Sequence, residues 1–189
     1  MPARPASTAD RARRERRPPR PLDRERLNEL ALAYLARFAT SAAKLEAYLR
    51  RKLRERGWAE EGEPPVMALV ERCVAAGYVD DAVYARAKAG SLRRRGYGNR
   101  RIDQTLGAAG IDAELREEVR ATILEERQAA LALARKRRLG PFGPPPQDRQ
   151  AIEKQVAVFL RAGHRMDIAR RVVKADDAAG LEAWVMEEE

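Results

Sequence analysis

The 189-residue chain contains little of what catalytic, metal-binding and membrane-spanning proteins usually need. It has a single cysteine, Cys73, and therefore cannot form an internal disulfide. It has a single histidine, His164, and no cluster of residues at metal-ligand spacing. No apolar run is long enough to cross a bilayer or to serve as a signal peptide. We therefore expect a soluble, cytoplasmic protein with no membrane partner, no metal, no cofactor and no catalytic residues.

Aromatic residues are also scarce, at 5% of the chain, and the 12 glycines and 11 prolines are clustered. The apolar content of 44% is consequently mostly Ala, Leu and Val. This composition predicts an all-α fold.

Two segments interrupt the helical pattern. Residues 1–22 contain five prolines and show no hydrophobic periodicity, so we expect a disordered Arg/Pro-rich tail. The net charge is +9, and the excess of nine arginines over four acids in residues 1–26 supplies more than half of it. The second break, GPFGPPPQD at 140–148, removes several backbone donors, so no helix can continue through it.

Apolar residues recur at steps of three and four between these breaks, which indicates amphipathic helices. The first stripe predicts one buried helix face and consists of Leu27, Leu30, Ala31, Tyr34, Leu35 and Phe38. Two further stripes follow, from Leu45 to Leu53 and from Val66 to Val74. Helices this short do not fold alone, so we expect them to share a small core.

Three glycines show a longer period. Gly57, Gly110 and Gly163 lie 53 residues apart, and each closes an apolar helical stretch. This spacing predicts three tandem three-helix repeats that stack into an elongated, curved array. The predicted repeats cover 23–78, 79–125 and 126–176, and a C-terminal segment covers 177–189. The alternative is an accidental spacing within an ordinary helical bundle.

Asp80 and Asp81 are the most conspicuous carboxylates in the chain. They follow Gly77 and precede an apolar run, so Asp80 is predicted to cap the next helix and Asp81 to stabilise its positive end. A catalytic or metal-binding pair is the alternative, but no His, Cys or third acid lies nearby in the sequence.

A basic run follows this predicted cap. Residues 86–101 contain no acid, whereas residues 112–126 are acidic, so the middle repeat is polarised. The run is either a solvated helix face or an interaction surface for a partner or DNA. Its basic residues are Arg86, Lys88, Arg93, Arg94, Arg95, Arg100 and Arg101.

Three other residues have two possible roles each. Tyr97 either stacks on a nucleic-acid base or packs on the core, and we favour packing. Cys73 is predicted to be a buried thiol and not a reactive one. His164 is predicted to lie at a helix end and not to act as a ligand or base.

The sequence resembles the RecX family of RecA modulators. The likeness is carried by RFATSAAKLEAYLRRKLRERGW in the first repeat, by AAGYVDDAVYARAKAGSLRRRGYGNRRIDQTLGAAGI in the second and by FLRAGHRMDIARRVV in the third. It covers roughly residues 24–175. The pair Gly163-His164 departs from the family's glycine-aromatic pair, and the prolines at 141–146 lengthen the third repeat.

The resemblance implies a regulatory protein and not an enzyme. Such a protein binds RecA-DNA filaments in their helical groove and inhibits recombinase, ATPase and co-protease activity, which regulates DNA repair and the SOS response. We expect it to act as a monomer. One alternative is a direct DNA-binding module that acts through the basic tail and the basic repeat face. Another is a passive helical scaffold.

Overall fold

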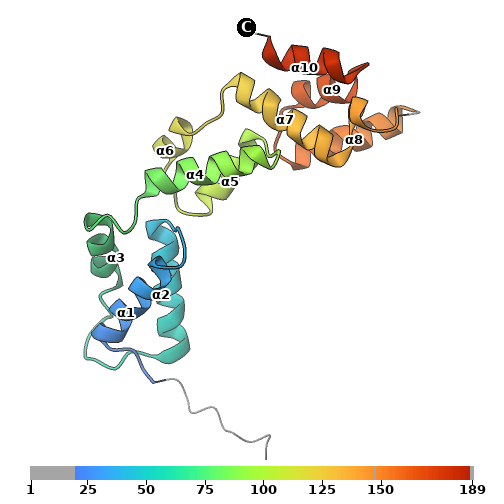
Figure 1. Ribbon diagram of the computed structural model, residues 1–189. Coiled ribbons are helices and arrows are strands. Elements are labelled where there is room, and N and C mark those ends of the chain that lie inside the picture. Colours follow the sequence, from blue (N-terminus) through green and yellow to red (C-terminus); the bar gives the residue numbers. More distant parts are fainter. Residues whose placement is uncertain (1–19, 147, 188–189) are drawn as a thin grey trace, which may run out of the picture.

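The computed structural model describes residues 20–146 and 148–187 of the chain. Over these residues the chain forms ten α-helices and one short 3-10 helix, and none of the described helices is long and apolar enough to span a membrane. The helices follow one another along an elongated, curved array (Figure 1). In chain order they are α1 (Arg24–Leu35), α2 (Ala42–Arg56), α3 (Val66–Ala75), α4 (Asp81–Arg94), α5 (Asn99–Gly107), α6 (Ala113–Glu118), α7 (Ile123–Arg137), η2 (Gly140–Phe142), α8 (Arg149–Arg161), α9 (Met166–Val173) and α10 (Ala178–Met186).

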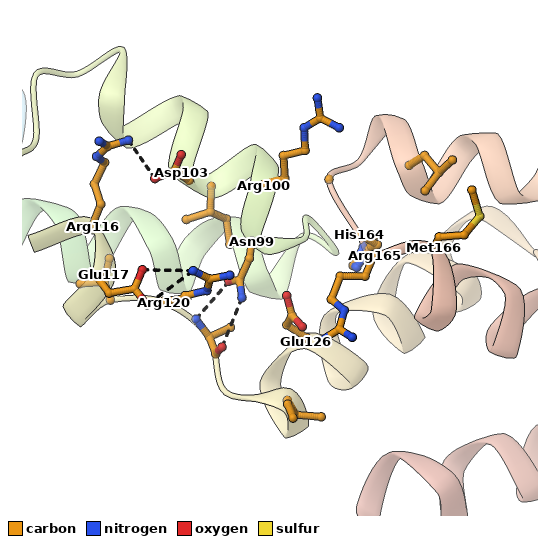
Figure 2. Close-up of a pocket in the computed structure, with 16 residues that line it drawn as sticks. Asn99, Arg100, Asp103, Arg116, Glu117, Arg120, Glu126, His164, Arg165 and Met166 are labelled. Atoms are coloured by element: carbon orange, nitrogen blue, oxygen red, sulfur yellow. Dashed lines mark hydrogen bonds and ion pairs between the residues drawn. The ribbon is translucent and has the colours of Figure 1, made fainter. Parts of the chain in front are cut away.

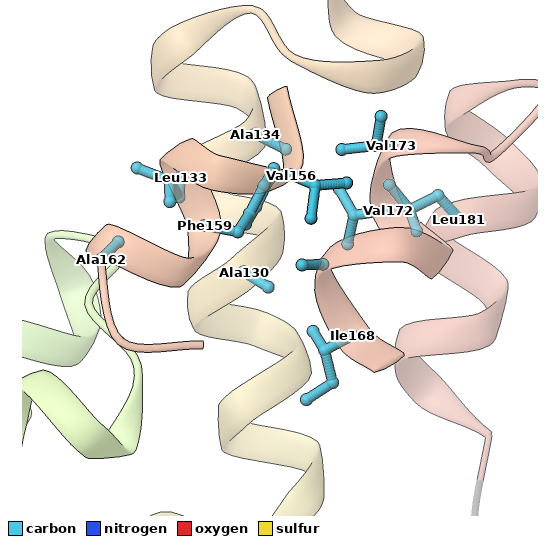
Figure 3. Packing of buried hydrophobic residues seen from close by; sticks show 11 residues of the cluster. Ala130, Leu133, Ala134, Val156, Phe159, Ala162, Ile168, Val172, Val173 and Leu181 are labelled. Carbon is cyan, nitrogen blue, oxygen red and sulfur yellow. The ribbon is translucent and has the colours of Figure 1, made fainter. Parts of the chain in front are cut away.

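Each third of the array has its own hydrophobic core. Leu27 and Leu49 belong to the cluster of α1 to α3, and Leu106 belongs to the cluster of α4 to α6. Phe159 and Val172 lie in the cluster that α7 to α10 enclose (Figure 3). The predicted all-α array of three-helix repeats is therefore confirmed, while the boundaries assigned to its domains stay a prediction.

The first junction between repeats joins the start of α2 to the turn after α5. The hydroxyl of Ser41 donates a hydrogen bond of 2.5 Å to the carbonyl of Ala109. The amide of Ala42 donates to the Asp81 carboxylate at 2.9 Å. Gly110, at φ +75°, lies so close to Ala43 that a Cβ at this glycine would overlap the alanine side chain.

The second junction repeats this arrangement at Gly163, which lies 53 residues after Gly110. The amide of Gly98, just before α5, donates to the carbonyl of Ala162 at 3.0 Å, and the amide of Arg100 donates to the carbonyl of Gly163 at 3.2 Å. A Cβ at Gly163 would overlap the Arg101 backbone. At both junctions the start of a repeat's middle helix thus packs on the glycine turn that ends the middle helix of the following repeat.

At the glycine turn of the first repeat, residues just before α1 occupy the position that a preceding repeat takes at the other two turns. Leu22 is fully buried. Its amide donates to the carbonyl of Gly57 at 3.0 Å, and its carbonyl accepts from the amide of Ala59 at 2.9 Å. The prediction of a disordered tail through residue 22 is therefore wrong for Leu22, because this side chain fills a core site. Residues 1–19 of that predicted tail lie outside the described residues.

Two further features differ from the predicted pattern. Phe38 does not belong to the buried stripe, because α1 ends at Leu35 and the Phe38 side chain is 50% exposed. The C-terminal segment contains α10, which packs on α7 and contributes the buried Leu181 to the core of the third repeat.

Candidate interaction surface

The basic residues of the run 86–101 lie on α4, at its C-cap Arg95 and on α5. Most of them have no acidic partner among the described residues, although the chain forms ion pairs elsewhere. A cation without an internal partner keeps its full charge for a ligand. The residues in this group are Arg86, Lys88, Arg94, Arg95, Arg100 and Arg101.

Two of these cations meet in one groove, together with a third from the first repeat. Lys88 of α4, Arg101 of α5 and Lys44 of α2 line a groove of about 310 Å³. No acidic residue lines it. We call this site, formed by Lys44, Tyr84, Lys88, Arg101, Gln104, Thr105, Ala108 and Ala109, the basic groove. It lies at the junction between the first and second repeats.

Lys44 is held in place by Tyr84. Its Nζ atom lies 3.3 Å from the Tyr84 hydroxyl and 5.7 Å from the centre of the Tyr84 ring. The amide of Lys44 also donates to Ser41, the N-cap of α2, so the junction itself positions this lysine. The groove therefore depends on correct packing of the two repeats.

Arg93 has a different role from its neighbours. Its guanidinium donates to Glu125 at 3.2 Å and to the carbonyl of Val119. It thus ties α4 to the segment that enters α7, and its side chain is only 20% exposed. We conclude that Arg93 holds the fold together and is not available to a ligand.

The remaining cations of the run lie in separate places. Arg95 covers the ring of Tyr97 at 5.4 Å, and Tyr97 packs against the cores of both the second and the third repeats. Arg94 lines a small hollow next to α7, and Arg86 is exposed on α4. Arg100 faces away from the basic groove and lines another cleft. The run is therefore not one continuous patch.

The two adjacent aspartates have distinct local roles. Asp80 is the N-cap of α4, and its carboxylate accepts from the amide of Val83 at 2.8 Å. Asp81 is the first residue of α4 and accepts from Ala42 across the first junction. Asp81 thus satisfies an amide at the start of α2, which sequence reasoning did not foresee. Across the described residues, no group of three His, Cys, Asp or Glu side chains is placed to hold a metal ion.

A larger cleft of about 710 Å³ lies at the second junction (Figure 2). Arginines at its edges pair with neighbouring acids, as Arg116 does with Asp103 at 2.9 Å and Arg165 with Asp167 at 2.7 Å. Glu126 is buried at its base, and this burial raises the pKa of the Glu126 carboxyl, although Arg165 opposes the rise. The cleft therefore carries mixed charge, unlike the basic groove.

His164 forms part of the wall of this cleft. Its Nε2 atom lies 3.0 Å from the carbonyl oxygen of Gly96, and its ring packs edge-on against Phe159 at 5.7 Å. Burial lowers the pKa of His164, while the hydrogen bond to Gly96 partly opposes this. Cys73 is likewise buried, which raises the pKa of its thiol.

The sequence did not reveal the contribution of Lys44 and Tyr84 to the basic groove. Lys44 lies 44 residues before Lys88 and belongs to another repeat, so no local pattern joins them. The only available signal was the 53-residue period, which predicts that consecutive repeats touch.

Comparison with known proteins gives consistent matches. Residues 80–119 match a family model described as the second three-helix domain of RecX. A Myxococcus xanthus protein named "Regulatory protein RecX" is 36% identical over 180 residues, which cover 88% of this chain and 95% of that protein. A Deinococcus radiodurans protein of the same name is 40% identical over 139 residues, or 72% and 65% of the two chains.

A solved structure supports the fold independently. The crystal structure of RecX from Lactobacillus salivarius superposes with a TM-score of 0.62, over 85% of this chain and 97% of that one. The sequences are 18% identical, so this comparison concerns the fold alone.

Proposed function

The chain belongs to the RecX family of regulatory proteins, and from this premise we propose that it binds RecA-DNA filaments in their helical groove and inhibits RecA. Inhibition would extend to recombinase, ATPase and co-protease activity, and thereby regulate DNA repair and the SOS response in the cytoplasm. The relatives are named as regulatory proteins, and the proposed mechanism is binding without catalysis.

The observation that carries the proposal is the basic groove on an elongated array. A filament presents the same subunit surface repeatedly, so a curved body can contact neighbouring subunits through several modest patches at high effective concentration. Lys44, Lys88 and Arg101 converge without an acid among the groove residues, and they can meet acidic filament surface or DNA phosphates.

Bridging of adjacent subunits accounts for inhibition. A ligand shifts a conformational equilibrium only when it binds one state better than the other. A monomer that fits one spacing of subunits therefore slows the rearrangements that accompany nucleotide turnover. Hydrogen bonds across both junctions, such as Ser41 to Ala109 and Gly98 to Ala162, favour one arrangement of neighbouring repeats and so support such a fit.

The experiment is a titration of the protein against DNA-dependent ATP hydrolysis by RecA. We expect the intact chain to slow hydrolysis at sub-saturating amounts. The double variant Lys88→Glu/Arg101→Glu should need about 10-fold more protein for the same effect, or about 1.4 kcal/mol. Lys154→Glu is the control, because Lys154 is an exposed lysine of α8 outside the groove. Inhibition that is absent in the intact chain would refute the function, and equal inhibition by both variants would refute the groove.

The direct DNA-binding alternative predicts a different result. It requires tight binding to DNA without RecA, with an affinity that falls steeply as salt rises. Deletion of residues 1–19 tests the basic tail while retaining Leu22, which the first repeat needs. Loss of RecA inhibition after this deletion, with the groove intact, would favour the alternative.

A further inference from the structure

One side of α3 is buried in the core of the first repeat and the other side faces outward. The helix packs on α2 and lies at the outer edge of the repeat (Figure 1). Its buried residues are Val66, Leu69, Val70 and Cys73. On the outward side, Met67 and Val74 are 50% and 46% exposed, and their spacing of seven residues places them on one face of the helix. The outward side of α3 therefore presents apolar surface to solvent.

Tyr78 extends this apolar surface beyond the end of α3. Its amide donates to the carbonyl of Cys73 at 2.9 Å, which fixes its backbone in the turn after the helix. Its side chain is 63% exposed and makes no ring or cation contact among the described residues. Single exposed apolar residues are common on proteins, but a group of them is typical of an interaction site. We call Met67, Glu71, Val74 and Tyr78 the outer face of α3.

Acidic residues border the outer face of α3. Residues 60–81 contain six acids and one arginine, although the whole chain has a net charge of +9. Glu61 and Glu63 lie in the loop that enters α3, and Glu71 lies on the face itself. These three acids are exposed and have no ion pair among the described residues. A ligand that matches this face should therefore be basic and should offer groups that pack on an aromatic ring.

The N-terminal tail, residues 1–19, is attached beside the loop that enters α3. The carbonyl of Leu22 accepts from the amide of Ala59 at 2.9 Å, and the amide of Arg24 donates to the Glu60 carboxylate at 2.7 Å. A fully extended segment of this length spans about 60 Å, whereas α3 is about 15 Å long. The tail can therefore reach every residue of the outer face of α3.

The composition of the N-terminal tail matches that face. Residues 1–19 contain six arginines, two acids and four prolines. Guanidinium groups pair with carboxylates and stack on aromatic rings, and proline-rich segments bind to aromatic surfaces. A tethered segment also meets its site at an effective concentration on the order of millimolar, which a separate partner does not reach. These arguments favour the chain's own tail over a basic segment of another molecule.

We propose that the N-terminal tail docks on the outer face of α3 of the same chain. Its arginines then pair with Glu61, Glu63 and Glu71, and one guanidinium covers the ring of Tyr78. Exposed ion pairs are individually weak, so docking depends on several of them together and on low salt. While the tail is docked, its arginines are withheld from acidic surfaces outside the chain, and the contact is therefore autoinhibitory. It requires no recombinase and thus goes beyond the proposed function.

The test uses trypsin on the full chain, because trypsin cleaves after arginine and cuts the tail only while it is undocked. The reference is a free peptide of residues 1–22, and mass spectrometry follows cleavage within residues 1–19. At low salt we expect cleavage to be about 10-fold slower in the chain than in the peptide. About 1 M sodium chloride should remove this difference, because it screens exposed charges.

Removal of the three unpaired carboxylates should release the tail. The triple variant Glu61→Gln/Glu63→Gln/Glu71→Gln should be cleaved about 10-fold faster than the unchanged chain at low salt, which is the combined effect of three exposed ion pairs. The control removes three exposed acids of α6 and α8 and so changes the net charge equally. It is Glu114→Gln/Glu118→Gln/Glu153→Gln, and its tail should remain as protected as in the unchanged chain.

The contribution of the ring is measured separately. Tyr78→Ser should accelerate tail cleavage about 3-fold, as expected for the loss of one exposed contact between a cation and a ring. Phe38→Ser is the control, because Phe38 is a half-exposed ring of the same repeat that lies just after α1. This control should leave the cleavage rate unchanged. Circular dichroism shows whether each variant folds.

A spin label on the variant Ser7→Cys locates the docked tail. The label attaches to this position because Cys73 is buried. At low salt it should broaden the backbone amide NMR signals of residues 61–78, and the broadening should disappear in the triple variant of Glu61, Glu63 and Glu71.

Three results would overturn the proposal. Equal rates of tail cleavage in the chain and in the peptide would mean that the tail does not dock. Equal acceleration in the two triple variants would indicate a general effect of net charge. Broadening confined to helices other than α3 would place the tail on another surface. None of these results depends on whether the intact chain inhibits RecA.

Discussion

The Nε2 atom of His164 lies 3.0 Å from the carbonyl oxygen of Gly96 and so joins the third repeat to the second. Because a carbonyl oxygen only accepts hydrogen bonds, the proton of the neutral ring must reside on Nε2. The Nδ1 atom is then an acceptor, buried and without a hydrogen-bond partner among the described residues. Protonation of Nδ1 would place an unpaired charge inside the junction.

This geometry predicts a loss of stability in mild acid. Burial lowers the pKa of His164 below its ordinary value of 6.5, so the unfolded chain binds the proton more readily than the folded one. The stability that neutral His164 contributes is thus fully present above the pKa of the unfolded chain. It is lost as the pH falls from there toward the pKa of the folded chain. Urea unfolding at several pH values across this window should show a falling free energy of unfolding.

The variant His164→Gln separates this effect from others. Glutamine can still donate to Gly96 but does not titrate. Glu126 has a raised pKa and acts in the opposite sense, since it stabilises the fold as the pH falls, and it is retained in the variant. The unchanged chain should therefore lose more stability than the variant over the same pH range, and parallel curves would contradict the prediction.

Substitution at Gly110 should destabilise the junction between the first two repeats. Gly110→Ala introduces a side chain at φ +75°, which costs about 1–2 kcal/mol. It also forces a Cβ into Ala43, and overpacking of this kind costs about 1–3 kcal/mol more. Calorimetry should show a lower melting temperature and a first repeat that unfolds apart from the rest.

Gly77→Ala is the matched control for this experiment. Gly77 has nearly the same φ, +73°, but a Cβ there would meet no atom within 4 Å. This variant should bear only the conformational cost. Equal destabilisation by the two substitutions would show that the contact between Gly110 and Ala43 contributes nothing.

Arg93 should be needed for stability and its neighbour Arg94 should not. Arg93→Ala removes two hydrogen bonds, to Glu125 and to the Val119 carbonyl, and bonds that involve charged groups contribute about 1.5–3 kcal/mol. Arg94→Ala alters an exposed side chain and should change the free energy of unfolding by less than about 0.5 kcal/mol. Chemical denaturation compares the two variants directly, and an inert Arg93→Ala would return this arginine to the candidate binding residues.

Leu22 should behave as a core residue although it precedes the first helix. Leu22→Ala is expected to lower the free energy of unfolding by about 2–5 kcal/mol, because the side chain is fully buried. The control Leu32→Ala removes an equal side chain that is 51% exposed on α1 and should cost little. Similar costs for the two would mean that the segment before α1 does not hold the first repeat.

The repeating helices and their cores could be predicted because their causes are local. The apolar spacing of a helix, the polar residue that caps it and the glycine that ends it lie within a few residues of one another. Asp80 is an example, because its cap depends on Val83, three residues away. The 53-residue spacing of Gly110 and Gly163 likewise has a structural cause, because at each of them the preceding repeat approaches too closely for a Cβ.

The candidate site could be predicted only in part, because its geometry depends on contacts between repeats. The basic run was evident, but the separation of Arg101 from Arg100 onto different faces follows from the direction of α5 in the array. The internal contacts of Arg93 depend on Glu125, 32 residues away. Phe38 was assigned to the core because the period of three and four continues past Leu35, where the helix itself ends.

Stacked units with matching ends have no inherent length, since any unit that exposes a free receiving surface can accept another copy and grow into a fibre. The carbonyl of Gly57 corresponds in position to that of Gly163, which accepts the amide of Arg100, but Gly57 is already occupied by Leu22 of the same chain. A single buried leucine of the same chain thus covers the surface of the first repeat to which another unit could otherwise add.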